Sequence, residues 1–353
     1  MPRIKTLYPF FIAITLLLTC TEVPAAQPPL RSPWDFIHVT VTNAPYACPA
    51  PIHLSPNLTT SGFYADSRGS IIDPDKWKAY QLSSGPVKQL GNLAVAAADA
   101  FQTTGSREAA RCVLTLERTA ALDKALTGTM SSNQAYFVQG WVTGALAIAL
   151  LKVRDSGVVG ADDSRLLGDW METVSKQTVG FYQRRDAATE GKGNNHLYWA
   201  GVQVAAVAIV ANNRKLFDWA VAAYRNGIAQ ITSAGTLPLE MRRGRRALHY
   251  HLYAAAPLVY LAEFGADNGL DLYAEDHYAL KRLVDRSIAG LEGSGYFDKV
   301  TGIRQDLPDG PPSAEAIGWA QVYVHRFPDP AIAKLLAEAK SRSYMYLGGL
   351  PPY

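Results

Sequence analysis

Apolar residues recur at helical spacing along most of this chain. From Trp77 onward the pattern has a period of three to four residues, interrupted by short polar or glycine-containing breaks. We expect helices at 87–101, 107–126, 133–155, 162–185, 194–211, 214–231, 239–264, 270–291, 313–327 and 330–341. No stretch alternates apolar and polar residues for long enough to compete as a strand, so the pattern predicts an all-α chain.

Several of the predicted helices carry small residues on more than one face, as at 205–208 and 220–223. Small residues permit close contact on both sides of a helix, and short breaks favour antiparallel neighbours. Such hairpins can pack as a ring whose inner layer lines a cavity. The sequence shows neither an internal repeat nor a linker from 77 to 353, so we predict one domain there.

Residues 1–76 lack the helical pattern. Arg3 and Lys5, an apolar core at 10–18 and small residues at 23–26 predict a signal peptide over 1–25, and therefore a periplasmic or secreted bacterial protein. A membrane anchor would need a longer apolar stretch, so we expect no membrane association after signal removal. Segment 26–76 is rich in Pro, Gly, Ser and Asn, which predicts extended chain.

Within this extended segment, residues 61–68 combine aromatic, glycine and arginine residues, including Tyr64 and Arg68. This composition is typical of a flexible flap over a binding site, and an ordinary surface loop is the alternative.

Composition limits the function only weakly. Of the 353 residues, 48% are hydrophobic and 18% are charged, as in a globular protein with a proper core. The net charge of +3 falls to about +2 without the signal peptide, which favours an acidic partner slightly and gives no indication of nucleic-acid binding. We expect a monomer.

Cysteine usage predicts one disulfide. Cys20 is lost with the signal peptide, which leaves Cys48 and Cys112 as an even pair in an oxidising compartment. The cysteines are too few for a metal site, and the histidines show no metal-ligand spacing. We therefore expect neither a metal nor another cofactor.

Two motifs stand out from the helical background. The first is NNHLYW at 194–199, where an Asn before an apolar run is a natural helix N-cap. Asn195 and His196 should therefore lie in the first turn, whose unpaired N–H groups and positive dipole end favour a carboxylate.

The second motif is RRGRRALHYHLY at 242–253. If it is helical, Arg243, Arg246, Tyr250 and Tyr253 share one face. A basic run is more often a solvated helix face than a binding site, so the run alone does not establish one.

These two motifs, about fifty residues apart, resemble those of polysaccharide lyase family 5, the alginate lyases. The likeness extends from about Leu58 to the C-terminus and is strongest in the motifs themselves. The resemblance implies an incomplete (α/α) toroid and a catalytic set of Asn195, His196, Arg243 and Tyr250. It also implies β-elimination from a 4-linked uronate, in which the C5 proton is removed and the C4 oxygen is expelled.

That chemistry requires a neutralised carboxylate, a base and an acid. Asn195, His196 and Arg243 suit the first task. Tyr250 is the natural proton carrier, because the positive charges of Arg243 and Arg246 favour the ionised form of a nearby phenol. We favour Tyr250 as acid and also as base, and His196 remains the alternative base.

Further residues near the motifs or on similar segments are candidates for sugar binding, because aromatic faces stack on sugar rings and polar groups bind hydroxyls. Each aromatic could equally fill the core. The flap lacks the lysine that is usual in the family, which leaves the substrate preference open. The candidates are Tyr64, Arg68, Gln134, Gln139, Trp141, Tyr198, Trp199, Arg246, His249 and Tyr253.

The substrate class implied is polymannuronate or alginate, with polyglucuronate and hyaluronan as open alternatives. Two alternative functions remain open. A glycoside hydrolase would need two opposed carboxylates, for which Glu190, Asp218 and Glu240 are available. A non-catalytic polyuronate-binding protein could use the same arginines and aromatics.

Overall fold

The structure, a computed structural model, describes residues 2, 28–185 and 193–353. Nearly all of the predicted signal peptide and Glu190 lie outside these residues. In the described ranges the regular elements are helical, and strand-like pairing is limited to isolated bridges. The all-α prediction is therefore confirmed.

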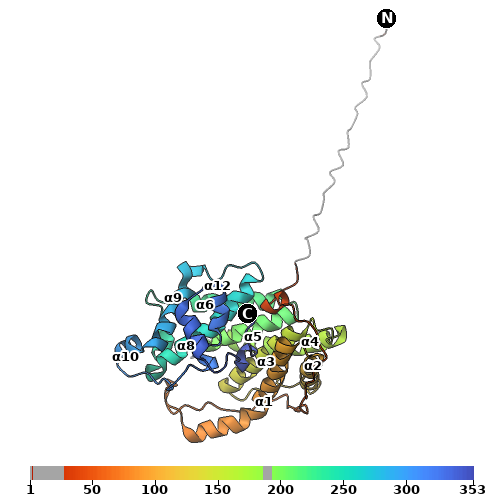
Figure 1. Cartoon of the computed structure of the whole chain (residues 1–353), viewed down its shortest axis with the longest axis horizontal. Helices are drawn as coiled ribbons and strands as arrows, with labels where there is room; N and C mark the ends of the chain where they lie inside the picture. Colours follow the sequence, from red (N-terminus) through yellow and green to blue (C-terminus); the bar gives the residue numbers. More distant parts are fainter. Residues whose placement is uncertain (1, 3–27, 186–192) are drawn as a thin grey trace.

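The helices agree with the predicted order, although several bounds differ (Figure 1). The α-helices of the described residues are α1 (Pro74–Thr104), α2 (Arg107–Leu122), α3 (Asn133–Val153), α4 (Ala161–Gln183), α5 (Asn195–Val210), α6 (Arg214–Ile228), α7 (Pro238–Met241), α8 (Ala247–Ala266), α9 (Glu275–Glu292), α10 (Gly295–Thr301), α11 (Ala314–Ile317), α12 (Ala320–Arg326) and α13 (Pro330–Glu338). Three short 3-10 helices are η1 (Pro33–Phe36), η2 (Gly244–Arg246) and η3 (Met345–Leu347).

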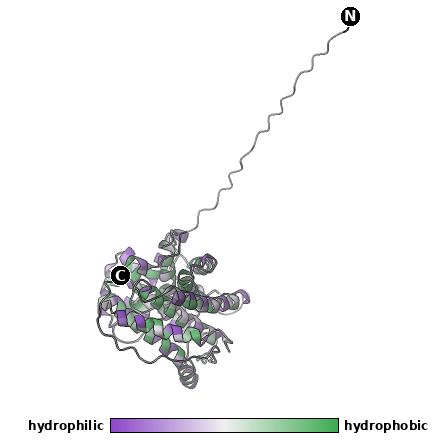
Figure 2. Ribbon diagram, turned by 90° about the vertical axis from the view of Figure 1, so that its right-hand side faces the viewer, coloured by the Kyte–Doolittle hydropathy of each residue, from purple (hydrophilic) through white to green (hydrophobic). Residues whose placement is uncertain are grey.

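Successive helices pack as hairpins, α1 with α2, α3 with α4, α5 with α6 and α8 with α9. Helices α3, α5 and α8 form the inner layer and are buried along almost their whole length. Helices α2, α4, α6 and α9 bury only one face, and hydrophilic and hydrophobic residues are interspersed along the outer helices (Figure 2). This double layer explains why the inner sequences are apolar all round and the outer ones amphipathic.

Helix α3 is long and apolar enough to cross a membrane by length and composition. However, 83% of its most apolar window is buried inside the protein. The inner position of α3 explains this composition without a membrane.

Helix α1 corrects the prediction that helical structure begins at Val87. It starts at Pro74 behind the N-cap Asp73, whose side chain accepts hydrogen bonds from two backbone N–H groups, and it continues through Pro86. A proline removes one helical hydrogen bond. The turn that loses it lies at the surface, where Leu82 is exposed and water can replace the bond.

The C-terminal part departs further from the prediction. The helix expected at 313–327 is divided into α11 and α12 at Gly318 and Trp319, where the backbone hydrogen bonds change to the i to i+3 pattern and the Trp319 side chain is fully buried. The helix expected from Leu270 begins at Glu275, and α10 has no predicted counterpart.

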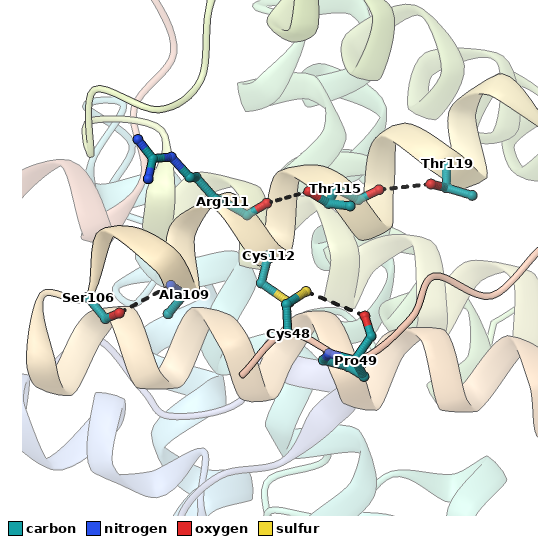
Figure 3. The surroundings of a disulfide bond; sticks show 8 residues. All are labelled: Cys48, Pro49, Ser106, Ala109, Arg111, Cys112, Thr115 and Thr119. Atoms are coloured by element: carbon teal, nitrogen blue, oxygen red, sulfur yellow. Dashed lines mark hydrogen bonds between the residues drawn. A yellow bond between two sulfur atoms is a disulfide. The ribbon is translucent and has the colours of Figure 1, made fainter. Parts of the chain in front are cut away.

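The segment before α1 is extended and wraps around the hairpins. Its backbone pairs with the chain at Thr42 with Ser106 and at Leu58 with Met130. Between these points Cys48 forms a disulfide with Cys112 on α2 (Figure 3). The segment then leads into residues 61–72, called the flap below, which ends where Asp73 caps α1.

Candidate active site

A cleft of about 710 Å³ lies between the flap, the first half of α1, the N-terminal ends of α3 and α5, and the start of α8. Most of the predicted site residues meet in it although they come from distant parts of the sequence. The predicted residues that line the cleft are Tyr64, Gln134, Trp141, His196, Arg243, Arg246, His249, Tyr250 and Tyr253.

Three predicted sugar-binding residues lie behind the cleft instead. The Gln139 side chain is fully buried and donates hydrogen bonds to the Leu126 carbonyl and to Gln177. Tyr198 donates to the Gly193 carbonyl, and Trp199 donates to the Tyr253 carbonyl at 3.0 Å. These residues support the site from the core, so their assignment to sugar binding is corrected.

Arg68 also differs from its predicted role. Its side chain is exposed and does not line the cleft. Its backbone carbonyl accepts a hydrogen bond of 2.9 Å from Nη1 of Arg243. The flap therefore uses the main chain at Arg68 to hold a cleft arginine.

The N-terminus of α5 already holds a carboxylate, and that carboxylate belongs to the protein. Asn194 caps the helix by accepting from the His196 N–H. The backbone N–H and the side-chain amide of Asn195 both donate to Oε1 of Glu240 at 2.9 Å. The anion that the sequence predicted at this helix end is thus Glu240, and the fully buried Asn195 lies beneath the cleft surface.

Glu240 is buried and linked to the catalytic arginine candidate. Burial raises the pKa of its carboxyl, while Arg243 and the bonds from Asn195 oppose this shift. Oε2 of Glu240 lies 3.6 Å from Nε of Arg243. Because Glu240 does not line the cleft and Asp218 is exposed on α6, neither provides the opposed carboxylate pair of a glycoside hydrolase.

Arg243 lies between Glu240 and the flap. Its guanidinium carbon is 4.5 Å from the centre of the Tyr250 ring, a cation–π arrangement. Gly69 packs against it with a φ of 64°, and a Cβ there would come within 2.2 Å of Nη1. A glycine is therefore required where the flap passes over Arg243.

Tyr250 is hydrogen-bonded to the flap. Its hydroxyl oxygen lies 2.6 Å from that of Tyr64, which in turn accepts a bond of 2.8 Å from Nη1 of Arg246. Burial and the nearby Tyr64 raise the pKa of Tyr250 well above its usual value and outweigh Arg243 and Arg246, which lower it. The expectation that the arginines ionise this phenol is thus wrong, because the Tyr250 hydroxyl stays neutral.

His196 is neutral as well. Its ring stacks on Phe137, with centroids 3.7 Å apart and planes inclined by 7°. Burial lowers its pKa to about 3, with help from the charges of Arg243 and Arg185. Burial, with help from the charges of Arg246 and Arg243, also lowers the pKa of His249 to about 3. Neutral imidazoles can donate one N–H and accept at the other nitrogen.

Several cleft residues were missed by the sequence analysis. Phe137 supports His196, and Tyr346 stacks on Trp141 with centroids 5.1 Å apart. From α1, Lys88 lies 4.3 Å above the Tyr80 ring. No local pattern indicated them, because they lie outside both motifs and reach the cleft only through packing of the fold.

A family model described as alginate lyase matches residues 57–297. The chain belongs to the alginate lyase family. A polysaccharide lyase of Stenotrophomonas maltophilia strain K279a is 33% identical over 289 residues, covering 81% of this chain and 84% of the relative. An alginate lyase of Pseudomonas fluorescens strain SBW25 is 30% identical over 320 residues, covering 88% of this chain and 84% of the relative.

Solved structures of the alginate lyase family show the same fold. Alginate lyase A1-III from Sphingomonas species A1 superposes with a TM-score of 0.71 at 21% identity, covering 84% of this chain and 83% of that one. A histidine-to-alanine variant of A1-III, complexed with a tetrasaccharide, superposes with a TM-score of 0.77 at 20% identity, covering 87% and 86%. The predicted (α/α) toroid is confirmed, and the chain is a polysaccharide lyase.

Proposed function

We propose that this alginate lyase family member cleaves polymannuronate by β-elimination and leaves a 4,5-unsaturated uronate at the new chain end. The observation that carries the proposal is the meeting of Arg243, His196 and Tyr250 in one cleft that also contains aromatic rings. The relatives named alginate lyase support the substrate class. In this proposal the anionic polysaccharide binds in the cleft as the substrate.

The substrate carboxylate must be neutralised before its C5 proton becomes acidic enough to remove. Arg243 suits this task because its planar guanidinium is held by Glu240 on one side and by the flap carbonyl of Arg68 on the other. His196 suits it as a neutral N–H donor, since its ring is fixed against Phe137. Asn195 acts beneath them by fixing Glu240.

Tyr250 is the proton carrier in this proposal. A protonated phenol is the form that can donate to the departing C4 oxygen. In mannuronate the C5 proton and the C4 oxygen lie on one side of the ring, so a single group can serve both steps. To act as base, Tyr250 must first release its own proton to solvent. The phenolate then takes the C5 proton and passes it to the departing C4 oxygen, which regenerates the phenolate.

Two features favour that proton loss once substrate is bound. Arg243 and Arg246 both lie within 5.4 Å of the Tyr250 ring centre and stabilise a phenolate. The Tyr64 hydroxyl accepts from Arg246 and can therefore donate its own proton to Tyr250. A hydrogen-bond chain from a fixed cation to the phenolate oxygen results.

Stereochemistry sets the expected substrate range. Glucuronate shares the C4 and C5 configurations of mannuronate and differs at C2, so polyglucuronate and hyaluronan present the same reacting atoms. Guluronate is inverted at C5, which moves the proton away from the base. A misplacement of this size costs on the order of 10²-fold in rate.

We also place the reaction in the bacterial periplasm. The disulfide between Cys48 and Cys112 suits an oxidising compartment. The intact mass of the protein recovered from a periplasmic fraction would test this, because export predicts that about the first 25 residues are removed.

The test of the function is an ultraviolet assay for the conjugated product. Initial rates should be highest on polymannuronate and at least about 10²-fold lower on polyguluronate. Chain cleavage without new absorbance would identify a hydrolase. Binding without cleavage of any polyuronate would identify a binding protein, and faster turnover of polyguluronate would contradict the assigned geometry.

A further inference from the structure

A second cavity of about 810 Å³ adjoins the cleft, and it is called the side lobe below. It lies between the end of the flap, α8, the loop at 306–313 and α11. Five residues line both spaces: Ile72, Arg246, His249, Tyr253 and Glu315. The cleft and the side lobe are therefore two parts of one groove, with the flap crossing the groove where they meet.

The two parts differ in charge. The cleft is lined by four cationic side chains and two carboxyl groups, and its two histidines are neutral. The side lobe is lined by two guanidinium groups, Arg245 and Arg246, against three carboxyl groups, Asp306, Glu315 and Glu338. A uronate carboxylate is therefore attracted to the cleft and disfavoured in the side lobe.

The walls of the side lobe are largely apolar. Leucine and isoleucine side chains and a proline-rich turn line it, including Ile71, Leu252, Leu307, Pro308, Pro311 and Pro312. The turn is held in place by Gln305, whose side chain accepts from the Leu248 N–H at 2.9 Å, and by the Asp306 N–H, which donates to the Arg245 carbonyl at 2.7 Å. The lobe thus combines a fixed apolar wall with carboxyl groups that disfavour an anion, and it lies beside a polyanion site.

We propose that the side lobe binds an acyl group carried by the sugar that neighbours the reacting uronate. This rests on the proposed function, because it places the uronate of the same polymer in the cleft. An acetyl group is uncharged, its methyl group suits the apolar wall, and its carbonyl oxygen can accept from Arg245. The substrate class that fits the whole groove is a polyuronate with acylated sugars.

An acyl group of this kind has two chemical sources. It is either an acetyl ester on a mannuronate or the N-acetyl group of a hexosamine that alternates with glucuronate. The experiment compares kcat/KM on four polymers in two pairs. The first pair is O-acetylated polymannuronate and the same polymer after alkaline deacetylation, and the second is hyaluronan and polyglucuronate of matched length. We expect a preference of about fivefold for the acylated member of one pair, as burial of one methyl group gives.

Variants separate the side lobe from the catalytic machinery. Ala316 lines the side lobe and not the cleft, so Ala316→Phe fills the lobe. Ala333→Phe is the matched control, because Ala333 lines a separate shallow cavity on α13. Leu307→Lys places a cation in the lobe wall and should reverse the preference in favour of the unacylated polymer.

Ala316→Phe should remove the acyl preference and leave kcat/KM on deacetylated polymannuronate within about twofold of the parent, since no cleft contact changes. The pair that shows the preference identifies the ester or the amide as the source. Equal rates on both members of both pairs, or an equal loss on acylated and unacylated polymers in Ala316→Phe, would overturn the proposal while leaving the lyase function intact. Absence of cleavage of any polyuronate would overturn both.

Discussion

The hydroxyl oxygens of Tyr64 and Tyr250 lie 2.6 Å apart, which joins the flap to the residue proposed to carry the proton. Arg246 donates to the same Tyr64 oxygen, so the three groups form a chain. The flap therefore contributes to the electrostatics of Tyr250 as well as covering the cleft.

Tyr64→Phe should lower kcat by about tenfold with little change in stability. The substitution keeps the ring and removes one hydrogen bond to the proton carrier, and a hydrogen bond to a charged group is worth about 1.5–3 kcal/mol. Initial rates on polymannuronate measure the effect. The same change at the exposed Tyr278 is the control. An unaltered kcat in Tyr64→Phe would show that the hydrogen-bond chain from Arg246 through Tyr64 to Tyr250 has no part in the mechanism.

Tyr250→Phe should reduce kcat by about 10²-fold or more, because only the hydroxyl that moves the proton is deleted. KM should change little, since the ring still packs under Arg243. Circular dichroism and oligosaccharide binding would establish that the fold and the cleft persist. If the variant retained a tenth of the parent rate, another group would have to carry the proton.

Glu240→Gln should lower kcat/KM by about tenfold while the protein stays folded. The amide keeps an acceptor for Asn195 but loses the charge that orients Arg243. Glu240→Ala should in addition cost about 1–3 kcal/mol of unfolding free energy, because it leaves the buried Asn195 N–H unpaired. Asp218→Asn on the exposed surface of α6 is the control, and parental kinetics in Glu240→Gln would show that Arg243 does not depend on Glu240.

Protonation of His251 should make the free energy of unfolding depend on pH. Its Nε2 accepts from the Leu237 N–H at 2.9 Å, so its Nδ1 carries the proton and donates to the Ala247 carbonyl. Burial lowers its pKa to about 4 in the folded protein. The unfolded chain binds a proton near pH 6.5 and the folded one does not, so stability falls as the pH drops from 6.5 to 4.

This loss should reach about 3 kcal/mol at pH 4 from His251 alone. Urea unfolding at pH 7, 6 and 5 would measure the slope. In His251→Gln the slope should become shallower by about 1.4 kcal/mol per pH unit. An unchanged slope in that variant would mean that His251 titrates alike in both states.

Reduction of the disulfide should destabilise the protein by about 2–4 kcal/mol. The bond between Cys48 and Cys112 closes a loop with a sequence separation of 64, and opening it restores chain entropy to the unfolded state. Paired Cys→Ser substitutions at both positions, compared with the parent by denaturant unfolding, test the value. Equal stability of the two proteins would contradict this contribution of the disulfide.

Local sequence patterns predicted the helices and the two motifs well, since hydrophobic period and capping depend on near neighbours. The N-cap at Asn194 is an example. The partner of Asn195 was not predictable in this way, because Glu240 lies 45 positions away and belongs to a separate helix. The pKa of Tyr250 was misjudged because the sequence shows the nearby arginines but not the degree of burial.

Helix packing explains the remaining differences. Tyr346 and Tyr80 reach the cleft from the two ends of the domain, and neither has a local signal. The first helix was expected only from 87, whereas α1 begins at Pro74 and continues through Pro86. Gln139, Tyr198 and Trp199 have the composition of a sugar site but face the core.

The carboxylate of Glu240 also determines how this cleft should respond to ionic strength. Its Oε2 lies 3.6 Å from Nε of Arg243. Burial raises the pKa of the Glu315 carboxyl, and the charge of Arg246 opposes that shift. Part of the positive charge is therefore balanced inside the protein before a polyanion arrives. Mobile ions screen attraction between separated charges but hardly reach such buried pairs. Between about 0.01 M and about 1 M salt, the KM for the polymer should therefore rise less steeply than the number of arginines in the cleft implies.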